Sequence, residues 1–108
     1  KQYDKAIRIY RQLIELNPKK ASYYSSIAHA YGLKGDLDRQ IENYRMCLKF
    51  DPEDDEAYAN LGAAYEKKGL YAEALKAYTS AFELNPEATQ VARKIPQMKI
   101  RILQQKQK

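Results

Sequence analysis

The sequence repeats itself at a fixed period of 34 residues, and residues 21–54 align with residues 55–88 without a gap. Identities at this shift include Tyr24 with Tyr58, Ala30 with Ala64, Tyr31 with Tyr65, Lys34 with Lys68, Gly35 with Gly69, Tyr44 with Tyr78, and Pro52 with Pro86. A period of this size is typical of stacked supersecondary units. Such units form extended surfaces rather than closed reaction chambers.

The apolar residues of each unit predict two amphipathic helices. They recur at i, i+3, i+4 and i+7, or close to it, which places them on one face of a helix. The first-helix stripes are Tyr24, Ile27, Ala28 and Tyr31, and then Tyr58, Leu61, Gly62 and Tyr65. The second-helix stripes are Leu37, Ile41, Tyr44 and Leu48, and then Tyr71, Leu75, Tyr78 and Phe82. We expect these stripes to form the core.

Residues that end or begin helices fall between the stripes. Gly35 and Gly69 each follow a lysine, which is typical of a helix C-terminus with a left-handed residue after it. Asp36 can cap the next helix through its carboxylate. Pro52 and Pro86 end the second helix of each unit, because proline has no N–H donor. The short connections predict antiparallel neighbouring helices.

Residues 1–20 align only with the second helix of a unit, so we expect a truncated repeat here. Its stripe of Tyr3, Ile7, Tyr10 and Ile14 should be partly bare. Either the native protein extends N-terminally, or another chain covers this face, for which domain swapping is one route. The chain starts at Lys1 without a methionine, and we expect it to be a fragment or a processed product.

Residues 89–108 predict a basic capping helix. Its inner stripe comprises Val91, Ala92, Ile95, Met98 and Ile102, and its polar outer face comprises Arg93, Lys94, Lys99 and Arg101. A terminal unit of a stack needs such a polar face for solubility. Pro96 lies in the middle of this segment, where proline costs about 3 kcal/mol and kinks a helix. We therefore expect a bend or a break there.

These motifs resemble the tetratricopeptide repeat family. Its pattern of an aromatic residue, Leu, Gly and Tyr in the first helix is met by Tyr58, Leu61, Gly62 and Tyr65, and its later small–aromatic–small–proline series by Ala74, Tyr78, Ala81 and Pro86. The preceding unit departs from the pattern with Gln40 and Cys47 where alanines are usual. We expect looser or more polar packing in that unit, with Cys47 buried as a small residue.

The resemblance implies an all-α fold of antiparallel helix-turn-helix repeats, stacked as a right-handed superhelix with a C-terminal capping helix. It also implies one domain over residues 1–108 that binds a peptide or a partner's helix in a concave groove and has no catalytic activity. The groove should lie opposite the core stripes of the first helices. The candidate groove residues are Ser22, Ser25, Ser26, His29, Leu33, Glu56, Ala59, Asn60, Ala63, Glu66, Lys67, Gln90, Arg93 and Lys94.

One subgroup of this family clamps a C-terminal carboxylate with basic and asparagine side chains. Asn60 stands where that subgroup has an asparagine, but Ser25 and His29 replace its lysine and second asparagine. Glu56 adds repulsion, and Gln90 and Lys94 match only in part. A clamp without its cations loses the charge-assisted bonds that it needs. We therefore expect another mode of binding.

Residues for catalysis or for holding a cofactor are few. One histidine and one cysteine do not make a zinc site of four protein ligands. Ser25 and His29 lie one helical turn apart and could touch, but a nucleophile also needs an oxyanion hole, which a helix interior does not offer. The four glycines are scattered and form no phosphate loop. We expect no enzyme activity, no metal and no cofactor.

The net charge of +5 is unevenly distributed. Residues 1–20 and 89–108 carry +4 and +6, whereas residues 21–54 and 55–88 carry −2 and −3. The six C-terminal bases, Lys108 among them, could contact nucleic acid or an anionic membrane, which is one alternative to peptide binding. A second alternative is a head-to-tail or swapped homo-oligomer, which the basic ends, the acidic middle and the partly bare N-terminal stripe favour. The C-terminal segment lacks the aromatic residues that single-strand binders use for stacking. A single cysteine and the absence of an apolar segment of membrane-spanning length fit the cytoplasm.

Overall fold

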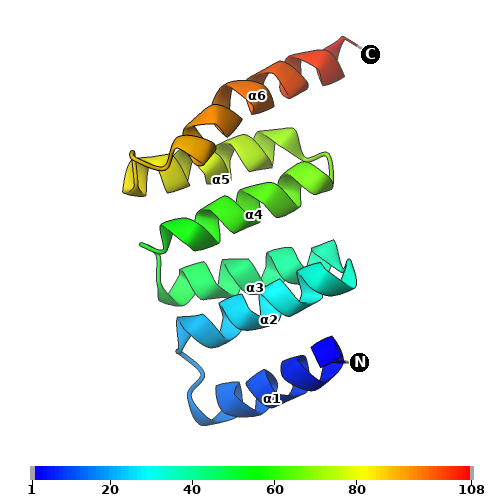
Figure 1. Cartoon of the computed structure of the whole chain (residues 1–108), viewed down its shortest axis with the longest axis vertical. Helices are drawn as coiled ribbons and strands as arrows, with labels where there is room; N and C mark the ends of the chain where they lie inside the picture. Colours follow the sequence, from blue (N-terminus) through cyan, green and yellow to red (C-terminus); the bar gives the residue numbers. More distant parts are fainter. Residues whose placement is uncertain (1, 108) are drawn as a thin grey trace. The chain divides into compact units, whose positions relative to one another are not determined.

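The computed structural model describes residues 2–107, so Lys1 and Lys108 lie outside the described residues. Within that range the chain forms six α-helices and no strand (Figure 1). The helices are α1 (Gln2–Leu16), α2 (Ala21–Lys34), α3 (Leu37–Phe50), α4 (Asp55–Lys67), α5 (Tyr71–Leu84) and α6 (Thr89–Lys106). The predicted all-α fold of paired helices is confirmed.

The helix starts keep the period of the sequence. Helices α2, α4 and α6 begin at residues 21, 55 and 89, and helices α3 and α5 begin at residues 37 and 71, so that each kind recurs after 34 residues. By this register α6 is equivalent to a first helix, and α1 is equivalent to a second helix. The pairs α2–α3 and α4–α5 are therefore complete repeats.

The helix ends are fixed by the predicted glycines and prolines. Gly35 and Gly69 adopt φ values of 83° and 78°, the left-handed region that costs little only for glycine. Behind them, the N–H of Asp36 donates to the carbonyl of Tyr31, and the N–H of Leu70 donates to that of Tyr65, both at 2.9 Å. These bonds satisfy carbonyls that the end of a helix leaves open.

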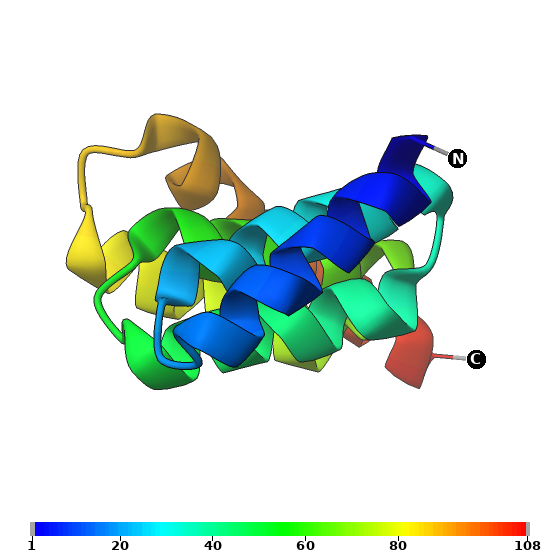
Figure 2. The same cartoon turned by 90° about the horizontal axis from the view of Figure 1, so that it is seen from below.

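Contacts divide the chain into two compact units, residues 1–53 and 54–108. In the first unit α2 packs against both α1 and α3, and in the second α5 packs against both α4 and α6. Figure 2 shows α1, in dark blue, lying along α2. Whether the chain behaves as the single domain expected from the sequence stays a prediction.

The core of each unit combines residues of the predicted stripes with residues outside them, such as Ala30 and Ala74. In the first unit a buried cluster joins Ile7, Ile27, Ala30 and Tyr31, while Tyr24 and Phe50 stack with their ring centroids 5.5 Å apart. In the second unit the buried cluster is Ala74, Tyr78 and Met98, with Tyr65, Tyr71, Leu75, Val91 and Ile95 packed against it. Aromatic rings therefore carry much of the buried area in both units.

The prediction that the α1 stripe is partly bare is confirmed at Tyr3, which is 39% exposed. Ile7 is only 6% exposed, and the partly buried Tyr10 and Ile14 pack against its cluster. Outside the stripe, Ile9 and Leu16 are exposed, at 48% and 84%. The reason is that the second helix of a repeat has two neighbouring helices in a complete stack. In α1 the stripe faces α2, the first helix of the following repeat, and a different edge of α1 is left uncovered.

The first repeat is more polar than the second, as expected, but it is not looser at Gln40. The Gln40 amide lies so close to Gly32 that a Cβ there would be 2.2 Å from Nε2. The second repeat has the sizes reversed, with Glu66 in the place of Gly32 and Ala74 in the place of Gln40. Cys47 is fully buried, as predicted.

Helix α6 continues through Pro96, so of the two expected alternatives, a bend or a break, the break is not present. Pro96 is exposed on the helix surface, and the inner side of the helix is held against α5 by the fully buried Met98. Of the predicted polar outer face, Arg93, Lys99 and Arg101 are exposed as expected, whereas Lys94 is half-buried. Lys94 and Arg101 also line a pocket together with residues of α4 and α5.

Asp36 caps α3 as predicted, and its contribution to the stability of the fold should depend on pH. Its carboxylate accepts from the backbone N–H and the Nη1 of Arg39, at 3.2 and 2.9 Å. The side-chain bond from Arg39, followed by the backbone bond, lowers the pKa of Asp36 below its usual 3.8. A carboxyl whose folded pKa is depressed adds stability above its unfolded pKa, and that stability is lost as pH falls through the folded value.

We expect Asp36→Asn, which keeps a capping oxygen but removes the charge, to be less stable than the wild type near neutral pH. The difference should shrink below about pH 4, where the unfolded carboxyl is already protonated. Urea denaturation followed by circular dichroism at about pH 7 and about pH 2.5 measures it. Glu83→Gln, at an exposed position of α5, is the matched control. A difference from the wild type that does not change with pH would contradict this assignment.

Candidate functional site

Helix α4 presents one buried face and one open face. It begins at Asp54, whose side chain accepts from the N–H of Ala57 at 3.0 Å. Two acids in its first turn and a lysine in its last turn complement the helix dipole. The buried face consists of Ala57, Leu61, Gly62 and Ala64. The open face carries the predicted groove residues of this helix.

Helices α4, α5 and α6 together enclose a pocket of about 350 Å³. Its lining comprises Ala63, Glu66, Lys67, Tyr71, Tyr78, Lys94 and Arg101, and we call it the α4–α6 pocket. Four of these residues, Ala63, Glu66, Lys67 and Lys94, are predicted groove residues. The fold therefore brings these four candidates into one hollow of the second unit.

Glu66 is the centre of the polar contacts in this pocket. The Tyr78 hydroxyl donates to Oε1 of Glu66 at 2.8 Å. The Lys94 ammonium lies 3.1 Å from Oε1 and 3.2 Å from Oε2 of the same carboxylate. One side chain thus links three helices, and both of its oxygens are occupied by donors on α5 and α6.

Tyr78 acts as a permanent hydrogen-bond donor. Its ring is buried at 3% exposure. Burial first, and then the bond to Glu66 and the charge of that carboxylate, raise the pKa of Tyr78 well above its ordinary value. The hydroxyl therefore stays protonated at neutral pH and holds Glu66 in place.

Two cations of the pocket have no carboxylate partner among residues 2–107. Lys67 is exposed in the last turn of α4. The Arg101 guanidinium lies 5.7 Å from the centre of the Tyr71 ring, a cation–π contact that orients it without neutralising it. Lys94, by contrast, is neutralised by Glu66.

The remaining candidates of the second unit lie outside the pocket. On α4, Glu56 and Asn60 are exposed and Ala59 is half-buried. On α6, Gln90 and Arg93 are exposed. The structure brings none of these five into the lining. They remain predicted groove residues.

In the first unit the candidates lie on the open side of α2. Ser22, His29 and Leu33 are exposed, and Ser25 and Ser26 are half-buried. The hydroxyl of Ser25 donates to the carbonyl of Ser22 at 3.0 Å, one turn back along the helix. That proton is directed to the backbone rather than to His29, so the serine is not set up as a nucleophile.

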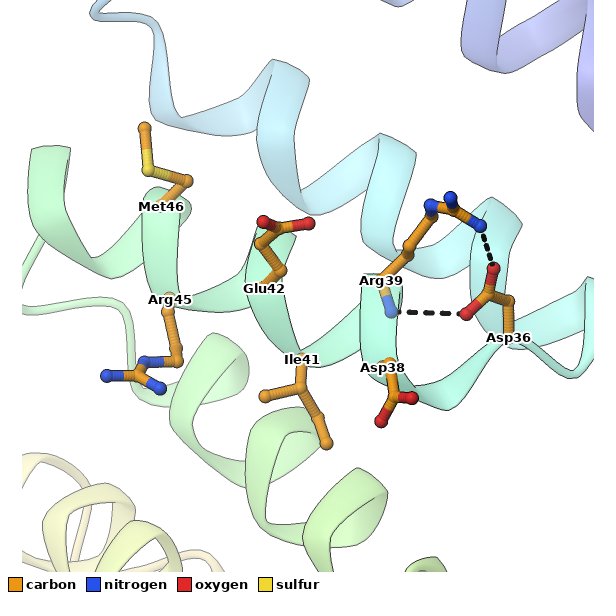
Figure 3. A pocket seen from close by; sticks show the side chains of 7 residues that line it. All are labelled: Asp36, Asp38, Arg39, Ile41, Glu42, Arg45 and Met46. Carbon is orange, nitrogen blue, oxygen red and sulfur yellow. Dashed lines mark hydrogen bonds and ion pairs between the residues drawn. The ribbon is translucent and has the colours of Figure 1, made fainter.

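A second hollow lies along α3 (Figure 3). Its lining is Asp36, Asp38, Arg39, Ile41, Glu42, Arg45 and Met46, all from α3 and its N-cap. Figure 3 shows the two bonds between Asp36 and Arg39 that begin the helix. A surface supplied by one helix, with Arg39, one of its two arginines, already engaged at the helix cap, makes a weaker candidate than the α4–α6 pocket.

Three pocket residues were not among the predicted groove residues: Tyr71, Tyr78 and Arg101. The two tyrosines belong to a core stripe, and the apolar pattern describes their rings but not their hydroxyl ends. The signal that could have found Arg101 is its spacing from Lys94, because seven residues make about two helical turns and place both on one face.

Within residues 2–107 no group of three or more His, Cys, Asp or Glu side chains could hold a metal ion. In the same range no helix is both long and apolar enough to cross a membrane.

Comparison with known proteins decides the family. A tetratricopeptide repeat profile matches residues 55–88, and a second repeat profile of the same name matches residues 1–35 and 33–69. The chain belongs to the tetratricopeptide repeat family. No curated protein matches it in sequence.

Solved structures of tetratricopeptide repeat domains superpose on this one. The first such domain of Spaghetti (RPAP3), bound to an HSP90 peptide, is 20% identical with a TM-score of 0.87, over 94% of this chain and 81% of that one. The Sgt2 domain from Aspergillus fumigatus is 26% identical with a TM-score of 0.85, over 99% and 72%. The TPR2B domain of yeast Sti1, in a pHsp70 complex, is 25% identical with a TM-score of 0.79, over 96% and 85%.

Removing the Tyr78 hydroxyl tests how strongly the three helices depend on Glu66. We expect Tyr78→Phe to lower the free energy of unfolding by about 1 to 2 kcal/mol, because a buried donor to a charged acceptor is lost. Tyr71→Phe is the matched control, since Tyr71 is half-buried and makes no hydrogen bond within residues 2–107. Urea denaturation measures both. Equal losses for the two variants would show that the bond to Glu66 contributes nothing.

Proposed function

We propose that this tetratricopeptide repeat domain is a non-catalytic interaction module that holds a peptide or a partner's helix against the open faces of its first helices. The observation that carries the proposal is the α4–α6 pocket, into which α4 directs Ala63, Glu66 and Lys67. Small residues such as Ala63 and the half-buried Ala59 let a partner backbone come close. A preformed surface also lowers the entropic cost of binding.

The solved structures of other tetratricopeptide repeat domains support a protein or a peptide as the class of partner. One is bound to an HSP90 peptide, and another stands in a pHsp70 complex. Both partners in those complexes are proteins or parts of proteins. We therefore propose a protein or peptide partner for this chain as well, without carrying over the identity of either one.

The chemistry of the pocket fits binding better than catalysis. Its carboxylate, Glu66, is saturated by Tyr78 and Lys94, so it is not available as a general base. No serine, cysteine or histidine is in the lining. A nucleophile or base within reach of a bound substrate would be needed for acyl or proton transfer.

Two large cationic side chains on α4 test the location of the site. We expect Ala59→Arg combined with Ala63→Arg to weaken partner binding by more than about tenfold, because the bulk and charge occupy the open face. Affinity purification with the wild type identifies the partner, and calorimetry compares the variants. The matched control is Ala72→Arg with Gln104→Arg, which adds the same charge at exposed positions elsewhere.

Circular dichroism must show unchanged helix content in the α4 variant. If that variant binds the partner as tightly as the control does, the site lies on another face of the domain.

Self-association is a second candidate function, favoured by one observation. Helix α1 exposes Ile9 at 48%, Tyr3 at 39% and Leu16 at 84%. In a complete repeat the residue equivalent to Ile9 is Ala77, which is buried at 6% exposure. A second copy of the chain could cover this edge of α1, as in a domain swap.

We expect the chain to associate as its concentration rises, and Ile9→Asp to remove that association without changing helix content. Analytical ultracentrifugation over a wide concentration range measures it. Because apolar contacts are insensitive to screening of charges by salt, added salt should not dissociate the oligomer. A wild type that stays monomeric at every concentration excludes self-association through α1.

A further inference from the structure

We propose that copies of this chain assemble head to tail. The open face of α6 in one copy packs on the open face of α1 in the next copy, and the two helices together complete a repeat. This inference rests on the proposed self-association through α1 and adds the surface that α1 contacts. It is independent of the peptide that the groove binds.

Helix α6 carries a second apolar row in addition to the row that packs on α5. This row lies on one face of the helix, because its members follow each other after three or four residues: Ala92, Pro96, Ile100 and Leu103. Pro96 is exposed, and Ile100 and Leu103 are exposed at 54% and 59%. Since Met98 and the inner row already lie against α5, the second row is an apolar face that is open to solvent.

In the complete repeats the same face of the first helix holds the second helix. Pro96 corresponds to Gly62 in the repeat period, and Gly62 lies directly against the ring of Tyr78 on α5. In the first repeat this position is Ala28, which is fully buried. Helix α6 has the register of a first helix, so its open row is the face on which a second helix would pack.

Helix α1 exposes the other half of such a pair. It has the register of a second helix, and no first helix precedes it among residues 2–107. Its open edge carries the exposed Ile9 and Leu16, with the half-buried Leu13 between them in the sequence. The residues that correspond to Leu13 in α3 and α5 are Cys47 and Ala81, and both are buried. The open edge of α1 is therefore the face that a first helix covers in the complete repeats.

The residues of the two open faces match in size as they do within the complete repeats. Each complete repeat has one long and one small residue at one pair of positions: Gly32 with Gln40, and Glu66 with Ala74. The corresponding residues of α6 and α1 are Ile100 and Ala6. This pair again combines a long with a small residue, and here both are apolar.

A polar contact at the helix ends has a counterpart as well. In the second repeat the Asn85 amide donates to the Asp55 carboxylate at 3.2 Å. The corresponding residues are Asn17, directly after α1, and Thr89, at the start of α6, and both are exposed. The Thr89 hydroxyl can accept a hydrogen bond from the amide of Asn17 in the next copy.

Larger side chains on α1 compensate for the proline on α6. Pro96 is bulkier than Gly62, so α1 cannot approach α6 as closely as α5 approaches α4. Ile9 and Leu13 stand where α5 has two alanines, and they fill the wider space between the helices.

The contact joins unlike faces, because each copy has one face of each kind. A contact of this sort does not stop at a dimer, but forms a ring if the rotation closes and an open chain if it does not. Two α1 edges packed on each other would instead form a symmetric dimer, in which the face of α6 stays open. The two arrangements therefore differ in the largest complex and in the helix that is needed.

Charge opposes this contact instead of driving it. Residues 1–20 and 89–108 carry +4 and +6, and Lys99 and Lys106 lie beside the apolar row of α6. We expect salt to strengthen the assembly, because it screens the repulsion between two basic ends. A contact between a basic end and the acidic middle of the chain would be weakened by salt. An acidic helix of another protein would also suit the bases of α6, but this chain already contains a helix whose open face has the matching register.

The test compares variants of the full chain by analytical ultracentrifugation from about 1 μM to about 1 mM, because the contact of a single helix pair is small. We expect the wild type to exceed twice the monomer mass at high concentration. Ile9→Asp and Ile100→Asp should each associate at least about tenfold more weakly, because each places a charge in the apolar contact. Leu33→Asp makes the same change at an exposed position of α2, so it is the matched control and should assemble like the wild type.

An equimolar mixture of the two weakened variants tests the pairing of α6 with α1 directly. Ile9→Asp keeps an intact α6 face and Ile100→Asp keeps an intact α1 face, so the mixture should form a dimer that does not grow further. Raising the salt from about 0.1 M to about 1 M, which shortens the Debye length from about 10 Å to about 3 Å, should increase the amount of this dimer. Circular dichroism must show equal helix content, and Leu103→Asp replaces Ile100→Asp if the latter is less helical.

Four results would overturn the inference: a wild type that stays monomeric at every concentration, a mixture without the dimer, dissociation by salt, or loss of assembly in Leu33→Asp. The single variants separate this inference from the proposed self-association. If Ile9→Asp is monomeric while Ile100→Asp still associates like the wild type, self-association through α1 stands and its contact with α6 does not.

Discussion

The packing of a tyrosine against a residue without a side chain underlies the structure of the second repeat. A Cβ on Gly62 would come within 3.0 Å of the Tyr78 ring, so the ring lies directly on the backbone of α4. This close approach brings α4 and α5 together. It also sets where the phenolic oxygen ends, because a rigid ring fixed on Gly62 carries its hydroxyl to Glu66. The same side chain is therefore a core residue at one end and a part of the pocket at the other.

The two repeats share their helix ends but differ in how they fill the space between helices. In the first repeat Gly32 receives the long side chain of Gln40. In the second repeat the corresponding residues are Glu66 and the fully buried Ala74. Each repeat therefore has one long side chain and one small residue at this pair of positions. Only the second repeat has a carboxylate, Glu66, at this position, and the polar contacts of the pocket depend on it. The pocket therefore arises from a sequence difference between the two repeats rather than from the features that they share.

Periodicity was sufficient to predict the helices, their ends and the buried stripes, because each of these depends on residues close in sequence. Glycines with positive φ and the Asp36 cap are local features of this kind. The face opposite the stripe also predicted Ala63, Glu66 and Lys67 as neighbours. The sequence pattern did not predict features that depend on contacts with two neighbouring helices at once. The exposed Ile9 lies outside the predicted stripe of α1, and the apolar pattern describes the ring of Tyr78 but not its hydroxyl.

The charge of the C-terminal segment is a second feature that the sequence alone describes incompletely. Six bases without an acid suggest a uniformly cationic helix that any polyanion could bind. In the fold, however, Lys94 and Arg101, about two turns apart, line the pocket with residues of α4 and α5, while Arg93 and Lys99 are exposed and lie outside its lining. Lys94 is paired with Glu66, and Arg101 lies over the Tyr71 ring. The basic composition of the segment therefore does not predict which of its charges are paired and which line the pocket, because both depend on residues of other helices.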